Sequence, residues 1–470
     1  MLEQSKYSEY SSEIFGKKRG IRMEKQKMKL LSAILMGVGS IIGASIFATT
    51  PIAIKIIGGD GIVVGFLCAA IFVFVRSVPE MLMVAALPAN GGSYMYLTRL
   101  VHPILGAWDA FNQLAVGVLK IATMALTFAT YFCMLVPACP EAVAAVGCII
   151  LFTVISWFGI KFSSSVQNVC VVILLIALGL YIICGWGACV VTFGEVISAT
   201  VELAPLWAAM GIMHGSRIGA NVLYYSAEDI ENPGKNVPIA YLISTIVTAV
   251  IYALLAYVTV GVMPNFYEID NLATVASKFM SPAMLLFFVA GGALLAVMTS
   301  INSAMMMFSR INFAAARDGL FPSAISRLNE HGAPGISLCF NSVVASLLII
   351  FGFNLEDVVK ITTIPGLFLL PIIFFSVFML PKKFPYAYKD SYIKTPHVLN
   401  CIITTIAGVA CVVIGWYVIG QMQPHNWIAM ICYYAIAIIY TICRRKYVMK
   451  KNGTDIFKAM AEPYTPWHEM

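Results

Sequence analysis

Glycine residues interrupt two long apolar segments of the chain. The first segment contains Gly37, Gly39 and Gly43, and the second carries three glycines at four-residue spacing within 211–219. Each glycine weakens a helix by roughly 1 kcal/mol relative to alanine, so both segments are expected to unwind part-way. In a membrane, the freed N–H groups attract a carboxylate and the freed carbonyls attract an ammonium group or Na⁺. An amino acid carries both charges about 3 Å apart, so the pattern indicates an amino acid site.

The same glycines also suit close packing between helices. Gly39 with Gly43, and Gly215 with Gly219, each form a small-xxx-small pair, and such pairs are common where membrane helices meet. This alternative stays open, although matched positions in two halves of a chain favour a binding site.

Ionisable side chains stand within several of the apolar segments. Arg217 lies inside the second glycine-interrupted segment, and Lys120 lies midway along 105–136. A charge at mid-membrane costs at least ~2.5 kcal/mol, so it usually faces the bundle interior; either cation can instead snorkel or pair structurally. Arg76 and Glu80 are four residues apart and share a helix face. A neutralising pair is the favoured interpretation, with Glu80 as a proton carrier the alternative.

The composition excludes most soluble classes. Sixty per cent of the 470 residues are hydrophobic and 11% are charged, whereas soluble domains carry roughly 25% charged residues. The chain is therefore expected to be an all-α integral membrane protein, since a spanning helix needs about 20 apolar residues. Twelve candidate spans are found at 30–53, 61–87, 105–136, 142–159, 165–186, 204–226, 238–262, 281–307, 335–353, 358–380, 398–420 and 426–443.

The basic residues predict the orientation of these spans. With the N-terminus inside, 24 of the 30 lysines and arginines fall in inside segments and three fall in outside loops. This asymmetry follows the positive-inside rule and predicts that both termini are cytoplasmic. It also explains the net charge of +7 without a nucleic-acid partner. Residues 1–29 and 444–470 are polar and basic, and both are predicted to be disordered cytoplasmic tails near anionic lipid.

The two interrupted spans predict an internal repeat. They are five spans apart, and five is odd, so the second copy enters the membrane with opposite polarity, as in inverted-repeat transporters. The predicted units are a first repeat at 30–186 (helices 1–5), a second repeat at 204–380 (helices 6–10) and two further helices at 398–443.

At these residues the chain resembles the amino acid–polyamine–organocation superfamily of permeases. Four stretches carry the resemblance in the family's order: Gly37–Phe47, Pro88–Leu97, Ala227–Pro238, and Arg310 through Pro322 to Pro334. The resemblance implies a LeuT-like fold of five plus five inverted helices, with discontinuous helices 1 and 6 and two C-terminal helices. It also implies alternating access and an amino acid or related amine as substrate.

The resemblance also implies a substrate site. The N–H groups at Gly43, Ala44 and Ser45 map to those that hold a carboxylate in the family, and the carbonyl near Ile41 maps to one that holds the amino group. The expected substrate-binding residues are Ile41, Gly43, Ala44, Ser45, Lys120, Gly215, Arg217, Gly219 and Asn221.

The chain departs from the family in ways that bear on substrate charge. Arg217 and Asn221 stand where the family has an aromatic and an acidic residue, and Lys120 maps to the part of helix 3 that lines the site. Two cations and no acid favour an acidic amino acid or related carboxylate over arginine or polyamines. The lysine that some members carry in helix 5 has no counterpart within 169–182, which puts proton coupling by that route in doubt.

Candidate ion-coupling groups are few. Ser300 and Ser303, with Asn302 between them, lie in the region of helix 8 where sodium-coupled relatives bind a cation, although such hydroxyls also bond back to their own helix. His214 lies beside the second break and titrates near neutral pH when solvated. Glu80 completes the candidate set.

The sequence therefore predicts a secondary active transporter in the cell membrane, an antiporter or an ion-coupled symporter, that moves an amino acid and favours an acidic one. Neutral amino acids, other amines or organic anions are alternative substrates. A channel is the third reading, which asymmetric glycine breaks do not favour. Sequence motifs of zinc enzymes, P-loop pumps and hydrolases are not found, so no enzyme, metal or cofactor is predicted. The expected partners are the amino acid, H⁺, Na⁺ or a counter-substrate, and membrane lipid.

Overall fold

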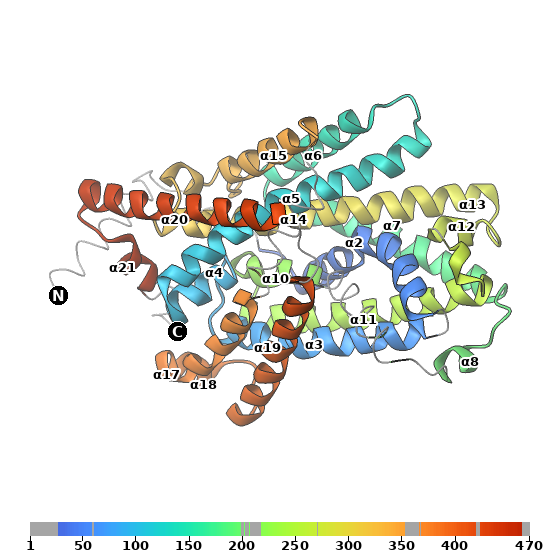
Figure 1. The fold of residues 1–470 in the computed structure, drawn as a ribbon, viewed down its shortest axis with the longest axis horizontal. Coiled ribbons are helices and arrows are strands. Elements are labelled where there is room, and N and C mark those ends of the chain that lie inside the picture. Colours follow the sequence, from blue (N-terminus) through green and yellow to red (C-terminus); the bar gives the residue numbers. More distant parts are fainter. Residues whose placement is uncertain are drawn as a thin grey trace.

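The protein is mainly helical within the residues that the computed structural model describes, which are 27–58, 61–198, 202, 206, 218–269, 271–352, 366, 368–419 and 424–462. Two isolated bridges, Met28 with Ile230 and Asn90 with Ser226, are the β pairing within these ranges. The helices form one elongated bundle (Figure 1).

The long helices are α2 (Leu30–Ile57), α3 (Ile62–Ala86), α5 (Pro103–Leu135), α6 (Glu141–Trp157), α7 (Ile160–Trp186), α11 (Pro233–Val262), α14 (Leu295–Arg317), α15 (Gly335–Ile350), α19 (His397–Ile419) and α20 (Pro424–Asn452). The short helices and turns are α4 (Ser93–Tyr96), η1 (Leu97–Val101), α8 (Phe193–Ser198), η2 (Ile218–Ala220), α10 (Asn221–Tyr225), η3 (Ala227–Asp229), η4 (Phe266–Glu268), α12 (Leu272–Ala276), α13 (Pro282–Phe287), η5 (Phe288–Leu294), η6 (Ser323–Ser326), η7 (Ser376–Met379), α17 (Leu380–Lys383), α18 (Pro385–Asp390) and α21 (Ile456–Ala461).

Six helical stretches in the described residues are long and apolar enough to cross a membrane. They are Ile62–Ala86, Pro103–Cys133, Ile160–Trp186, Pro233–Val262, Pro282–Arg317 and Pro424–Asn452, with shorter apolar helices at Leu30–Gly43, Glu141–Trp157, Gly335–Ile350 and His397–Val413. These helices coincide with ten of the predicted spans. The spans predicted at 204–226 and 358–380 lie largely outside the described residues, so the twelve-span count and the two repeats stay predictions.

The helices divide into a central set and a lipid-facing set. The first helix, α2, packs against α7, α11 and α14, and its residues Ile41, Ile42 and Ile46 are fully buried. In contrast, α20 lies at one side of the bundle (Figure 1) and exposes large apolar side chains such as Ile431 and Ile436. Such an apolar surface suits lipid contact rather than water.

The prediction that residues 444–470 form a disordered tail is wrong for 444–462. Helix α20 continues to Asn452, and α21 follows it. The cause is specific bonding: Arg444 donates to the carbonyls of Gly319 and Phe321, and Arg445 pairs with Asp455. Ile456 of α21 is buried against the bundle. The predicted N-terminal tail, apart from 27–29, and residues 463–470 lie outside the described residues.

Candidate functional site

Helix α2 is broken at Gly43, as the sequence predicts. The backbone there has φ +36° and ψ −163°, so two helical segments meet at this residue. That left-handed φ is one that glycine adopts readily. A β-carbon at Gly43 would also lie 2.0 Å from Oγ of Ser300 on α14. Only glycine therefore fits, and α14 closes directly over the break. The side chains of Ala44 and Ser45 lie outside the described part of the structure.

The second glycine-interrupted segment meets the first. It is described from Ile218, where the turn η2 leads into the short helix α10. A β-carbon at Gly219 would lie 2.0 Å from the carbonyl oxygen of Ser40 and 2.7 Å from the backbone nitrogen of Ile41. The two segments thus touch backbone to backbone just before the break at Gly43. His214, Gly215 and Arg217 lie outside the described residues.

The carbonyl groups before the break have a hydroxyl partner. Tyr252 of α11 donates its hydroxyl hydrogen towards the carbonyl oxygens of Ile41, at 3.1 Å, and Ile42, at 3.3 Å. The Tyr252 side chain is fully buried. It supports backbone groups that the helix break releases, since these groups cannot be left unpaired within a membrane.

Helices α2, α7 and α14 share a polar junction next to the break. Thr299 of α14 donates its hydroxyl to the carbonyl of Gly39 at 3.1 Å, and the Gln167 amide of α7 donates to the Thr299 carbonyl at 3.2 Å. The same amide lies 3.2 Å from Oγ of Ser303. Sequence reasoning named neither Thr299 nor Gln167, although both hold the first helix in place.

Ser300 and Ser303, the two hydroxyl residues that the sequence singled out on α14, have different surroundings. Ser300 lies against Gly43, as its distance to a β-carbon there shows. Ser303 instead donates to the Thr299 carbonyl at 2.9 Å and accepts from Gln167. Asn302 bonds to Gln167 and to Ser163 of α7. Only Ser300 of this predicted group faces the break.

Lys120 and Asn221 differ in their contacts. Lys120 is partly exposed and forms no ion pair among the described residues. Asn221 is buried at the start of α10, and its Oδ1 accepts a hydrogen bond from the hydroxyl of Tyr241 at 3.0 Å. The side-chain amide of Asn221 is thus held by α11.

Arg76 and Glu80 form the neutralising pair that the sequence favours. Arg76 Nη2 lies 3.3 Å from Glu80 Oε1, with the two side chains 1% and 3% exposed. The Arg76 guanidinium also stands 5.8 Å from the ring centre of Phe374. The pair lies on α3, between neighbouring helices, and joins none of the contacts at Gly43.

Segments distant in sequence meet at the end of the bundle where α2 begins. The Asn90 N–H donates to Glu228 Oε1 at 2.7 Å, and the Glu228 N–H donates back to Asn90 Oδ1 at 3.0 Å. Arg310 of α14 pairs with Asp229, and both are buried. The N–H of Met28 donates to the Asp229 carbonyl at 2.8 Å. Three of the four family-like stretches therefore form one cluster with the start of α2.

A second ion pair, between Arg99 and Asp318, connects η1 to the loop that follows α14. Arg99 donates through both Nη atoms to Asp318, at 2.7 and 2.9 Å, and the Tyr94 hydroxyl donates to the same carboxylate at 2.8 Å. Burial, followed by the nearby Asp318 charge, raises the pKa of Tyr94 well above its usual value. Tyr94 therefore stays a donor to Asp318 at physiological pH.

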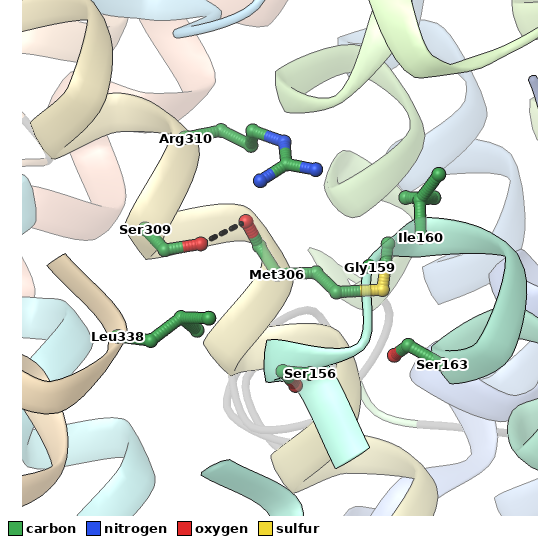
Figure 2. Close-up of a pocket in the computed structure, with 8 residues that line it drawn as sticks. All are labelled: Ser156, Gly159, Ile160, Ser163, Met306, Ser309, Arg310 and Leu338. Atoms are coloured by element: carbon green, nitrogen blue, oxygen red, sulfur yellow. Dashed lines mark hydrogen bonds between the residues drawn. The ribbon is translucent and has the colours of Figure 1, made fainter. Parts of the chain in front are cut away.

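Figure 2 shows a small cavity between α6, α7, α14 and α15. Its lining residues are Ser156, Gly159, Ile160, Ser163, Met306, Ser309, Arg310 and Leu338. The Ser309 hydroxyl donates to the Met306 carbonyl across one wall. None of the predicted substrate-binding residues lines this cavity, so it is separate from the break at Gly43.

Comparison with known proteins decides the family. The sequence pattern of the family described as amino acid permease matches residues 28–442. The chain belongs to this family. The match runs from the start of α2 into α20 and so covers both glycine-interrupted segments, and the resemblance inferred from the four stretches is confirmed.

Relatives of this permease carry transporter names. It is 23% identical over 393 residues to the branched-chain amino acid permease BcaP of Bacillus subtilis, covering 78% of this chain and 83% of that one. It is 24% identical over 449 residues to the methylthioribose transporter of the same organism, with 88% and 92% covered. It is 27% identical over 352 residues to the large neutral amino acids transporter small subunit 2 of Mus musculus, with 69% and 65% covered.

Membership of the amino acid permease family establishes the general activity of the protein. The permease is a membrane transporter and not an enzyme, as its sequence indicated. Its substrate is a small molecule, as expected of this family. The three relatives are named for different substrates, so membership of the family does not by itself identify the substrate of this permease.

Proposed function

We propose that this permease is a secondary active transporter that moves an amino acid across the cell membrane by alternating access, with both termini in the cytoplasm. The observation that carries the proposal is the contact between Gly219 and the Ser40 carbonyl next to the break at Gly43. Two interrupted helices that meet inside an apolar bundle supply free peptide groups, which a zwitterion can bind.

The proposed substrate binds at the break with its carboxylate towards the second α2 segment and its ammonium group towards the first. Its carboxylate accepts from the N–H groups of Gly43, Ala44 and Ser45, at the start of the second α2 segment, where the helix dipole favours negative charge. Its ammonium group donates to the carbonyls near Ile41, which Tyr252 already orients. Gly215 and Gly219 allow the second broken helix to approach the substrate closely.

The side chain of the substrate is proposed to be acidic. Lys120 has no ion-pair partner among the described residues, and Asn221, at the position of the family's acid, is uncharged and bonded to Tyr241. Arg217, four residues before Asn221 in the sequence, adds a second cation. A cation in a low-dielectric site attracts a carboxylate and repels cationic substrates.

Neutral amino acids are the second candidate. The relatives named for branched-chain and large neutral amino acids favour this class. In that case Lys120 acts structurally, and its removal leaves substrate preference unchanged.

The coupling of transport to an ion is a further part of the proposal. Ser300, with Thr299 beside it, suits Na⁺, since hydroxyl and carbonyl oxygens are hard ligands. His214, Ser303 and Glu80 remain the other candidates. Exchange against a counter-substrate is the alternative mode of coupling.

The test is uptake of labelled glutamate into vesicles that contain the purified permease, in competition with each common amino acid. We expect saturable uptake, stimulation by substrate on the opposite side, and inhibition by aspartate. Lys120→Ala is expected to lower glutamate affinity by about tenfold, as for loss of roughly 1.4 kcal/mol, while the exposed Lys161→Ala control leaves it unchanged.

Three outcomes separate the alternatives. Inhibition by leucine with none by aspartate favours the neutral class and overturns the acidic one. Conduction without saturation or counterflow indicates a channel. An unchanged affinity in Lys120→Ala assigns that lysine to structure.

A further inference from the structure

A buried carboxylic acid lies apart from the break at Gly43. Asp109 stands in the second turn of α5, and its side chain is 1% exposed. Oδ2 accepts the Ser93 hydroxyl of α4 at 2.6 Å, and Oδ1 lies 3.4 Å from the Gln113 amide. Neither donor is charged. Burying a carboxylate charge without a cation costs free energy, and binding a proton removes that cost.

The cations of the elements packed against α5 are engaged elsewhere. On η1, Arg99 pairs with Asp318, and on α14, Arg310 pairs with Asp229. The Arg317 guanidinium stands over the ring of Phe313.

The remaining neighbours supply hydroxyl groups or distant charges. On α20, Arg444 donates to backbone carbonyls and Arg445 pairs with Asp455. The titratable groups that face Asp109 are Tyr224 and Tyr225 of α10 and Tyr434 of α20. Lys120 of α5 stands three turns further along the same helix, and Lys458 of α21 makes no ion pair among the described residues. Asp109 therefore faces hydroxyl groups and no cation within ion-pair distance in the described structure.

A chain of hydrogen bonds connects Asp109 to α10. The Gln113 amide donates to the Tyr225 hydroxyl oxygen at 2.9 Å, and this hydroxyl lies 2.7 Å from Oγ of Ser93. Ser93 has one hydrogen, which it gives to Asp109. Tyr225 must then donate to Ser93, so a charged Asp109 fixes the direction of the whole chain.

Adding a proton to Asp109 reverses this direction. A hydrogen on Oδ2 is donated to Ser93, and the Ser93 hydrogen turns to the Tyr225 oxygen. That oxygen also accepts from Gln113, so the Tyr225 hydrogen loses its bond to Ser93. The proton is taken from solvent water in this scheme, and rotations of the Ser93 and Tyr225 hydroxyls accompany its binding.

Tyr225 links this change to the second glycine-interrupted segment. It ends α10, which follows directly from the turn that contains Gly219. The Tyr225 carbonyl also accepts from the Gly91 N–H at 3.1 Å, so the loop before Ser93 and the end of α10 are bonded together. A change of hydrogen bonding at Tyr225 therefore acts on the segment that carries the proposed substrate site.

We propose that Asp109 is a proton-binding site that couples transport to a proton gradient through Ser93 and Tyr225. The coupling role rests on the proposed transport function, whereas proton binding at Asp109 does not depend on it.

Proton binding is tested by infrared difference spectroscopy of the purified permease in lipid as pH is varied, with the proton as the only ligand. We expect a carbonyl band of a protonated carboxyl group that disappears as pH rises. The band is expected in wild type and in the control Asp390→Asn, which alters an exposed acid, and to be absent in Asp109→Asn. A band that persists in Asp109→Asn overturns the proposal.

A second measurement covers the case in which Asp109→Asn does not fold. Wild-type permease made with ¹³C-labelled aspartate is expected to show the band shifted to lower frequency. A band that does not shift belongs to a glutamate and overturns the assignment.

Coupling is tested by accumulation of labelled glutamate or leucine in vesicles under a pH gradient. One pH unit supports about tenfold accumulation at one proton per substrate. We expect this accumulation in wild type and in Asp390→Asn. In Asp109→Asn, the substrate concentration inside is expected to equal the concentration outside and not to exceed it. Accumulation in Asp109→Asn equal to wild type overturns the coupling role. If no amino acid enters in any variant, the transport proposal fails, and the infrared titration still decides the proton site.

Discussion

Gly219 lies against the carbonyl of Ser40 so closely that a β-carbon would stand 2.0 Å from its oxygen. The contact joins two segments that are about 180 residues apart in the sequence. It brings the turn before α10 onto the last residues before the break at Gly43. Gly219 is needed for this approach, and Gly43 is needed for the break and for the contact with Ser300; each gives a test.

Gly219→Ala is expected to push the two segments apart. The neighbours are backbone atoms of Ser40 and Ile41, which cannot rotate away as a side chain can. Overpacking of this kind costs about 1–3 kcal/mol, and we expect a lower melting temperature together with loss of uptake. The matched control is Gly147→Ala on α6, where an added β-carbon meets no atom within 4 Å. Equal uptake in the two variants would show that the close approach is dispensable.

Gly43→Ala combines a steric and a conformational penalty. The φ of +36° is strained for alanine, and Ser300 Oγ occupies the added space. Backbone strain of this type costs about 1–3 kcal/mol. The double variant Gly43→Ala with Ser300→Gly removes the clash but not the strain, so we expect partial recovery of melting temperature. Full recovery would mean that the backbone at Gly43 is not strained.

Ser300 and Ser303 are expected to respond differently to removal of their hydroxyls. Ser300 faces the break, whereas Ser303 bonds to Thr299 and Gln167 within the helix junction. If Na⁺ binds near the break, Ser300→Ala raises the Na⁺ concentration needed for half-maximal uptake, and Ser303→Ala leaves it unchanged. Vesicle uptake over a series of Na⁺ concentrations measures both. The reverse order of sensitivity would contradict the arrangement.

The buried Arg310–Asp229 pair is expected to hold the end of the bundle where α2 begins. Asp229→Asn leaves a buried guanidinium unpaired, and losing one partner of such a pair costs about 3–5 kcal/mol. Thermal unfolding in detergent measures the effect. The double variant Asp229→Asn with Arg310→Met should lose less than the sum of the two single variants. Strict additivity would indicate that the two side chains do not interact.

The docking of α21 is expected to depend on pH. Hydrogen bonds from Arg445, with the Phe457 N–H contributing, lower the pKa of Asp455. A lowered pKa stabilises the docked helix above the ordinary carboxyl value of about 3.9, and the effect is lost as pH falls through the folded value. The pair is partly exposed, so its contribution is at most about 1 kcal/mol.

Hydrogen–deuterium exchange of Ile456–Ala461 in wild type and Asp455→Asn measures this contribution. The variant should exchange faster at neutral pH, and the ratio of the two rates should approach one as pH falls. A ratio that is constant with pH would show that the carboxylate does not stabilise α21.

The sequence predicted the helical bundle and the first break because both follow from local composition. Long apolar runs can satisfy their backbone in a membrane only as helices, and three glycines near Gly43 locate the break. Arg76 and Glu80 were paired correctly because they share one helix and a four-residue spacing. These inferences needed no knowledge of how distant segments pack.

Features that depend on distant segments could not be read from the sequence. Thr299 and Gln167 gave no signal of their own, because threonine and glutamine in membrane helices have many uses. The Asp109 network joins residues from three elements, and only packing brings them together. The ordering of 444–462 depends on carbonyls at Gly319 and Phe321, so its basic composition was misleading.

The most direct test of the central claim is a thermal-shift screen of the purified permease against every common amino acid. A ligand that binds the folded state at 100 times its Kd stabilises it by about 2.7 kcal/mol. At least one amino acid should raise the melting temperature of wild type and Gly147→Ala, and it should not raise that of Gly43→Ala or Gly219→Ala. Equal shifts in all four proteins would contradict a substrate site where the two glycine-interrupted segments meet.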